Sequence, residues 1–287
     1  MSRAIFIAVA SVSLIACDCP TAPPSGAPSA VSGSTTPTAS ASTARPSLSA
    51  TSPTAKGSGE AKEQPKREPY KGPTGTLSGT IRATGDPAPT VNHQYPKGCE
   101  SAAGTYGKLF RTGQGGTLAD ALVAVTNYDG YVPPKSDAVA ITIRNCTYSA
   151  RTVALTDGQH IEIRNLDPIT SYLPYLDGAR ATATNVAVPR GSAVKLYSRG
   201  RQRYWLRDQM GRNFMVANVF HLPYSTTAVT GLDGRYRIEG LPVGEVKVSV
   251  MLPATKNLKH ISRKLTIKAG DNTLDLEFGF DAAKDSP

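Results

Sequence analysis

The stretch TTAVTGLDGRYRIEGLPVGEVKVSVMLP, residues 226–253, alternates apolar and polar side chains on both sides of two turns. The pair Asp233-Gly234 suits a tight hairpin turn, and a second turn follows at 241–242. Between and after these turns, alternate apolar residues point to one face of two successive strands: Tyr236, Ile238, Val246, Val248 and Val250. A period of two is the signature of half-buried β-strands, so this stretch predicts β-structure.

Similar segments occupy the chain from residue 75 to 280. They are short, rich in β-branched residues and separated by Asp, Gly and Pro, which is the turn spacing of β-sandwiches. Candidate strands lie at 76–84, 119–127, 138–145, 149–155, 159–165, 192–197, 202–208 and 213–220, with two more in 260–280. No long segment keeps a helical period of 3.6, so we expect an all-β protein with little helix.

The N-terminus has the layout of an export signal. Arg3 precedes a short apolar run that ends in small side chains, too short to span a membrane. The run closes on Leu-Ile-Ala-Cys at 14–17, which resembles the lipobox of bacterial lipoproteins. The resemblance implies removal of residues 1–16 and lipidation of Cys17, and several acyl chains would anchor the protein firmly. The alternative is an ordinary secretory signal that happens to contain a cysteine.

Residues 17–74 form a low-complexity segment of Ala, Ser, Thr, Pro and Gly with almost no large apolar side chain. Such a segment cannot offset its ordering entropy by burial, so we expect a disordered tether between the anchor and the folded part. We therefore expect an exported protein held in the bacterial cell envelope, at the outer membrane or its periplasmic face. Which membrane it occupies stays open.

The chain carries a formal charge of +10, of which +7 belongs to residues 75–287. Exported proteins meet few nucleic acids, so we expect no nucleic-acid partner. The expected counterions are membrane headgroups and anionic envelope polymers, with a protein or an anionic polysaccharide as the partner of the folded part.

Two family resemblances cover most of residues 75–280. Asp233-Gly-Arg-Tyr-x-Ile-x-x-Leu-Pro-x-Gly-x-Val-x-Val is similar to the signature of the carboxypeptidase regulatory-like domain, a prealbumin-like sandwich among the carbohydrate-binding-like folds. Cys146-Thr-Tyr-x-x-Arg-x-Val, IEIRNLDP at 161–168 and an aromatic-Pro-Tyr boundary at 220–224 resemble a cupredoxin-like domain. The resemblances imply two β-sandwich units: a cupredoxin-like one at 75–222 and a regulatory-like one at 223–280, which includes strand 75–84 if the first unit is an insertion. A tail follows at 281–287.

The cupredoxin resemblance also implies where copper ligands would lie. Two imidazoles, a thiolate and a weak axial thioether hold copper in such proteins. Aligned by eye, their positions fall on Ser171, Arg207, Met210 and Asn213, none of which keeps its ligand. Arg207 places a fixed cation there, and Met210 would fill the core. We therefore expect no metal and no cofactor.

The alternative interpretation is a copper or electron-transfer protein with a non-standard ligand set. Met210, Met215 and His221 are the residues it would use. Against it, Met215 is also expected to fill the core, and His221 lies at a domain boundary, where structural histidines are common.

Cys99 and Cys146 are the two cysteines of the folded part, and in an oxidising compartment we expect them to form a disulfide. A metal pair is the competing interpretation, but no histidine lies at ligand spacing from either cysteine. Cys19 lies beside Cys17 and has no assigned role.

The most unusual predicted surface is YSRGRQRYWLRD, residues 197–208. If 199–208 is extended, alternate residues share one face: Arg199, Arg201, Arg203, Trp205 and Arg207. Four guanidinium groups beside an indole could hold phosphate, carboxylate or a sugar ring. The alternative is a solvated basic strand whose charges prevent edge aggregation.

No nucleophile elbow, zinc-protease motif or phosphate loop occurs, and the four histidines are widely spread. The sequence predicts a lipid-anchored, non-catalytic envelope protein that contacts a protein, anionic glycan or lipid partner through sandwich surfaces.

Overall fold

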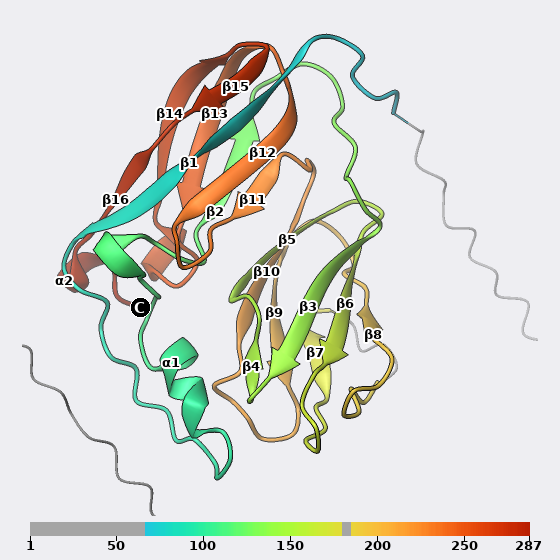
Figure 1. Cartoon of the computed structure of the whole chain (residues 1–287), viewed down its shortest axis with the longest axis vertical. Coiled ribbons are helices and arrows are strands. Elements are labelled where there is room, and N and C mark those ends of the chain that lie inside the picture. The colour runs from blue at the N-terminus through green and yellow to red at the C-terminus, as the bar shows by residue number, and fades with distance from the viewer. Residues whose placement is uncertain (1–66, 180–184) are drawn as a thin grey trace, which may run out of the picture. The chain divides into compact units, whose positions relative to one another are not determined.

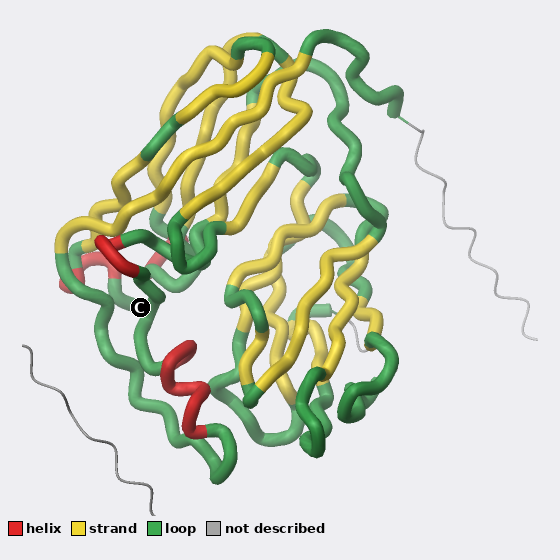
Figure 2. The backbone as a smooth tube through the Cα atoms, in the orientation of Figure 1, coloured by secondary structure: helices red, strands yellow, loops and turns green. Residues whose placement is uncertain are grey.

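The computed structural model describes residues 67–179 and 185–287. Regular structure in this part of the chain is almost entirely β-strand, arranged in four sheets (Figure 2). This confirms the predicted all-β class. The helical elements are single turns: η1 (Glu100–Ala102), α1 (Ala103–Tyr106), η2 (Gln114–Gly116), η3 (Lys256–Leu258) and α2 (Ala282–Asp285). None of the helices in the described ranges is long and apolar enough to cross a membrane.

The expected signal peptide, the lipidation residue Cys17, Cys19 and most of the expected tether lie outside the described residues. The end of the predicted tether, residues 67–74, lies inside them and contacts the folded part. Pro69 forms a β-bridge with Tyr131, and the Tyr70 N–H donates to the Tyr131 carbonyl at 2.7 Å. Residues 67–74, which were predicted to belong to the tether, therefore contact the folded part.

The strands between residues 138 and 222 form one sandwich, here called the inserted sandwich (Figure 1). Its first sheet has the order β4 (Thr147–Tyr148), β3 (Ala138–Arg144), β6 (His160–Asn165) and β8 (Val194–Leu196). Its second sheet has the order β5 (Thr152–Thr156), β10 (Ala217–Leu222), β9 (Arg203–Asp208) and β7 (Pro174–Asp177). Apolar side chains of both sheets share one core with Cys99, Ala102 and Tyr106 from the η1–α1 segment.

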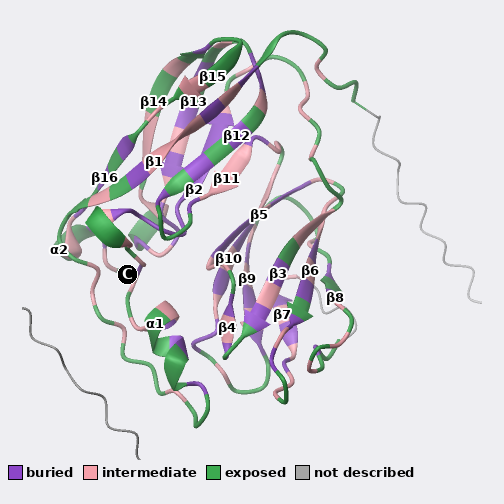
Figure 3. Ribbon diagram, in the orientation of Figure 1, coloured by how far each residue is buried: buried purple, intermediate pink, exposed green. Residues whose placement is uncertain are grey.

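The remaining strands form the second sandwich, here called the flanking sandwich. In one sheet β1 (Thr74–Gly85) pairs with β12 (Arg235–Pro242), β15 (Gly270–Thr273) and β16 (Leu276–Phe280). The other sheet has the order β11 (Thr227–Val229), β2 (Leu122–Thr126), β13 (Gly244–Met251) and β14 (His260–Ile267). The alternation read from the sequence appears as alternating burial along β12 and β13 (Figure 3).

The strands group as in the alternative in which strand 75–84 belongs to the second unit, and β2, which neither predicted boundary assigned to that unit, joins it as well. Strands β1 and β2 belong to the flanking sandwich, where Leu77, Ile81, Val123 and Val125 share one core with the C-terminal strands. The physical reason is pairing: β1 is antiparallel to β12 and parallel to β15 and β16, and β2 is antiparallel to β13. The inserted sandwich therefore interrupts the flanking one in sequence.

Two glycines of β1 allow other backbone segments to approach this strand closely. A Cβ at Gly75 would collide with the carbonyl oxygen of Lys268, and one at Gly79 with that of Leu274. Glycine inside a strand often marks such close backbone approach. The parallel strands β15 and β16 can therefore lie directly against β1.

The prediction of a hairpin at Asp233-Gly234 is wrong. The residues do form a tight turn, with Gly234 at a φ of 68° and its N–H donating to Gly231 O at 2.9 Å. The flanking strands β11 and β12, however, lie in different sheets, because β11 pairs with β2 and β12 pairs with β1. The turn therefore takes the chain from one sheet of the flanking sandwich to the other.

Candidate functional site

The four positions aligned with copper ligands lie at one end of the inserted sandwich, in and beside the β6–β7 and β9–β10 connections. Ser171 is half-buried, and Asn213 and Met210 are exposed, with Met210 at 51%. Arg207 lies on the outer face of β9, with Nε 3.0 Å from Asp177 Oδ2. The prediction that Met210 fills the core is wrong, because its loop extends beyond the sheet, whereas Met215 is fully buried as expected.

A buried ion pair, Asp208–Arg212, lies beside these positions. Asp208 directly follows Arg207, which the alignment places at a ligand position. Asp208 ends β9 with a fully buried side chain, whose Oδ1 accepts the Leu173 N–H at 2.7 Å. Its Oδ2 accepts Arg212 Nη1 at 2.8 Å, and the Arg212 guanidinium lies 4.6 Å from the centre of the Tyr172 ring. This pair links the β6–β7 and β9–β10 connections.

The sequence contained the signal for Asp208. Tyr204 and Leu206 face the core of β9, so the period of two also directs residue 208 inward and residue 207 outward. Arg207, on which the copper-ligand alignment falls, is the preceding residue, and neighbouring residues of a strand point to opposite faces.

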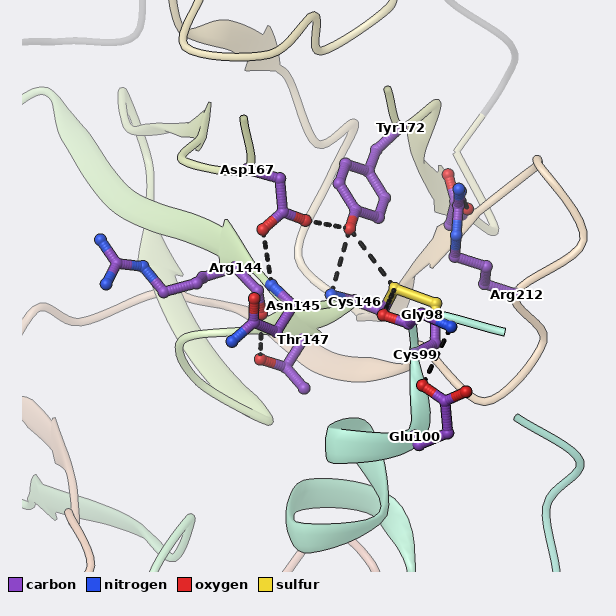
Figure 4. Close-up of a disulfide and its surroundings, with 11 residues drawn as sticks. Gly98, Cys99, Glu100, Arg144, Asn145, Cys146, Thr147, Asp167, Tyr172 and Arg212 are labelled. Carbon is purple, nitrogen blue, oxygen red and sulfur yellow. Dashed lines mark hydrogen bonds and ion pairs between the residues drawn. A yellow bond between two sulfur atoms is a disulfide. The ribbon is translucent and has the colours of Figure 1, made fainter. Parts of the chain in front are cut away.

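The predicted disulfide Cys99–Cys146 is present and lies next to the same end of the sandwich (Figure 4). Its half-cystines are 47 residues apart, with a Cα–Cα distance of 5.4 Å. Asn145 and Cys146 both have positive φ, 49° and 57°, so the bond closes on a tight left-handed turn. The disulfide therefore joins the η1–α1 segment to the β3–β4 turn.

The left-handed turn is held by a buried polar network. Asp167 Oδ1 accepts the Asn145 N–H at 2.7 Å, and its other oxygen accepts the Tyr172 hydroxyl (Figure 4). The Tyr172 oxygen in turn accepts the Cys146 N–H at 3.1 Å. Burial first, and then the hydrogen bond to Asp167, raise the pKa of the Tyr172 hydroxyl, so it stays a neutral donor. The role of Tyr172 and Asp167 is thus to satisfy the backbone of the turn.

Both ring nitrogens of His221 are engaged within the protein. Nδ1 lies 2.9 Å from Ser198 Oγ and Nε2 lies 2.9 Å from Asp157 Oδ1. Asp157 also pairs with Arg201, and these contacts, that with Arg201 first, lower the pKa of the Asp157 carboxyl despite partial burial. His221 therefore joins the loop after β8 to the β5–β6 turn. Within the described residues, no three His, Cys, Asp or Glu side chains are grouped to hold a metal ion.

The predicted arginine row is shorter than expected. Only 203–208 is a strand, so Arg199 and Arg201 lie in the preceding loop, where Arg201 pairs with Asp157. Arg203 Nη2 donates to Asn218 Oδ1 at 2.5 Å and to the carbonyl of Pro253 at 3.2 Å, and desolvation lowers its pKa. Arg203 is therefore a contact between the two sandwiches, and the anion-binding capacity of the row is reduced.

An arginine–aspartate cluster at the junction of the sandwiches was not predicted from the sequence. Arg111 donates twice to the carboxylate of Asp120, through Nε and Nη2, both at 2.7 Å. Arg151 on the inserted side donates to the carbonyls of Thr105, Lys108 and Leu109 at 3.0–3.1 Å, and its backbone N–H to Asp120 at 3.2 Å. Desolvation by burial lowers the Arg151 pKa. Arg111 and Asp120 are nine residues apart, but Arg151 lies 31 residues beyond Asp120, so no local pattern connects the cluster.

A cleft of about 270 Å³ opens where the chain crosses between the sandwiches, lined by segments 132–136 and 224–227. Glu239 at its edge pairs with Lys135 and with Arg237, whose Nε lies 2.8 Å from Glu239 Oε1. The hydrogen bond from Lys135, and then that from Arg237, lower the pKa of Glu239 to about 2. The single carboxylate of this cleft is thus shared by two cations, which leaves one positive charge in excess.

No family model and no curated protein matches the chain. Two solved structures with a cupredoxin-like fold are similar to about a third of it. A copper-containing nitrite reductase (NirK) from Thermus scotoductus SA-01 is 10% identical, with a TM-score of 0.26, over 34% of this chain and 24% of the reductase. Amicyanin from Paracoccus versutus is 17% identical, with a TM-score of 0.26, over 35% of this chain and 97% of amicyanin. The chain thus spans about a quarter of the reductase, and scores this low carry no inference about function.

Proposed function

We propose that the protein is an exported, non-catalytic β-sandwich protein that is anchored in the bacterial cell envelope through lipidated Cys17 and binds an anionic glycan. The cation-rich composition supports an anionic partner, with a formal charge of +7 on residues 75–287. The anchor and tether would keep the sandwiches within reach of the envelope polymers. A copper role is not favoured, because the candidate histidine His221 uses both ring nitrogens within the protein.

The observation that carries the proposal is the outer face of β9, here called the β9 row, on which Arg203, Trp205 and Arg207 are half-buried. Trp205, the single tryptophan of the chain, is half-buried on the outer face, with the Arg203 guanidinium 4.9 Å from its ring centre. Arg207 is next on that face, and Arg199 precedes the strand as an exposed side chain. An indole accepts the apolar face of a sugar ring, and guanidinium groups pair with carboxylates.

Binding of the full chain to polygalacturonic acid, a soluble carboxylate-bearing polysaccharide, tests this surface. Trp205→Ala should weaken binding about tenfold, the cost of losing one stacked aromatic contact of roughly 1.4 kcal/mol. Tyr197→Ala is the matched control, since Tyr197 is an aromatic residue with 54% exposure outside the β9 row. Equal affinity of Trp205→Ala and the unaltered chain would refute the proposed surface.

The anchor is tested separately. Cys17→Ser should move the protein from the membrane fraction to the soluble fraction and abolish incorporation of labelled fatty acid. Retention of the label in Cys17→Ser would contradict the lipidation assigned to this residue.

A further inference from the structure

The excess positive charge of the folded part is concentrated in the hairpin β13–β14 rather than in the β9 row. Residues 244–268 contain six lysines and arginines but one acidic residue, Glu245. The hairpin thus contributes +5 of the +7 carried by residues 75–287. Lys259 is used internally, because it pairs with Asp285 at 2.5 Å. Of the other five, Lys247, Arg263 and Lys264 lie on the paired strands, Lys256 lies in the η3 connection, and Lys268 directly follows β14.

Two of these cations lie directly opposite each other. Lys247 on β13 is the register partner of Lys264 on β14, and both side chains are exposed. Like charges in this arrangement destabilise an antiparallel pair. Neither residue has an ion-pair partner in the described ranges, and Glu245, two positions from Lys247 on the same face, is paired with neither.

The next pair of register partners on the same face carries hydroxyl groups. Ser249 and Ser262 are register partners, with their Oγ atoms 2.9 Å apart. On the next rung, His260 lies opposite Met251. Two cations, two hydroxyls and an imidazole therefore share one face of the ribbon, opposite to the face of Val246, Val248 and Val250 that packs into the core.

Protection of a sheet edge does not account for the lysine pair. Charged residues on an edge strand discourage edge-to-edge pairing, and β14 is such an edge. Lys247, however, lies on β13, which is hydrogen-bonded to β2 on one side and to β14 on the other. A cation on an interior strand, facing another cation, adds nothing to edge protection and costs stability.

We infer that the outer face of β13–β14, at Lys247, Lys264, Ser249 and Ser262, is a binding surface for a carboxylate-bearing glycan chain. The cations continue in the direction of β14, because Lys268 directly follows the end of the strand, four residues after Lys264. A line of charges fits an extended polymer better than a flat membrane. Carboxylates pair with the lysines, and sugar hydroxyls bond to the serine pair.

This inference rests on the proposed function only in the class of ligand, since it uses a different sandwich and different residues. The test is binding of the full chain to polygalacturonic acid, with dextran as a neutral polysaccharide. The double variant Lys247→Gln/Lys264→Gln should bind the acidic polymer about five- to tenfold more weakly, with a smaller dependence on salt. It should unfold at the same or a slightly higher temperature, because the like-charge pair is removed.

The matched control is Arg164→Gln/Arg235→Gln, which removes two exposed cations from other sheets and changes the net charge equally. Unaltered affinity of the lysine variant, or equal weakening by the control, would overturn the inference. Binding to anionic phospholipid vesicles that depends on the lysine pair, without binding to the polymer, would also overturn it. If Trp205→Ala weakens polymer binding and the lysine variant does not, the result supports the proposed β9 surface and contradicts the proposed hairpin surface.

Discussion

Replacing Asp208 by alanine removes the carboxylate that neutralises Arg212 at the end of the inserted sandwich. The Asp208 side chain is fully buried and that of Arg212 is 14% exposed, with 2.8 Å between Oδ2 and Nη1. The substitution also leaves the Leu173 N–H without its acceptor. Breaking a buried pair by removing one partner costs about 3–5 kcal/mol, because the other charge stays buried.

We expect a cost near the lower end of this range, about 3 kcal/mol, because Arg212 keeps its contact with the Tyr172 ring and some solvent access. For a folded part of this size, the melting temperature should fall by roughly 6–12 °C. The double variant Asp208→Leu/Arg212→Met removes both charges, and it should be more stable than Asp208→Ala.

Urea unfolding followed by tryptophan fluorescence measures these effects, because Trp205 lies on the same strand as Asp208. The reasoning would be refuted if Asp208→Ala lost less than about 1 kcal/mol, well below the range for a broken buried pair. It would equally be refuted if the double variant were the less stable of the two.

Three further predictions concern the disulfide, the cleft and the arginine row. Replacing Cys99 and Cys146 by serine should lower the free energy of unfolding by about 2–4 kcal/mol, and the same urea midpoint with and without reductant would contradict this. Glu239 has its pKa lowered from 4.5 to about 2, so its contribution to stability is complete above about pH 4.5 and lost as the pH falls through 2. Urea midpoints of Glu239→Gln should therefore lose part of their dependence on pH in that window, and an unchanged acid limb would count against the pairing. Arg203→Ala should cost about 1–2 kcal/mol more than Arg199→Ala, because Arg203 bonds to the carbonyl of Pro253 in the other sandwich, and calorimetric melting of both variants checks the difference.

The position of the proposed binding surface illustrates how tertiary contacts change the interpretation of a charge pattern. In sequence, the arginines at 199–207 look like a continuous cationic face. In the fold, Arg201 and Arg207 have acidic partners and Arg203 bonds to the other sandwich. The lysines of β13 and β14 attract less attention in sequence, yet the register brings two of them together without such partners.

Local periodicity alone determined the all-β class, the inward faces of β12 and β13, and the scarcity of helix, because side-chain direction in a strand depends only on parity. The cysteine count and the expected oxidising compartment likewise led to the Cys99–Cys146 bond. Strand partners were decided only in three dimensions. The backbone groups of β12 could bond to any strand within reach, and β1, more than 150 residues earlier, took that place instead of the adjacent β11. The parity of β9 directs Asp208 inward, but its contact with Leu173, like that of Arg151 with Asp120, was decided only by the tertiary structure.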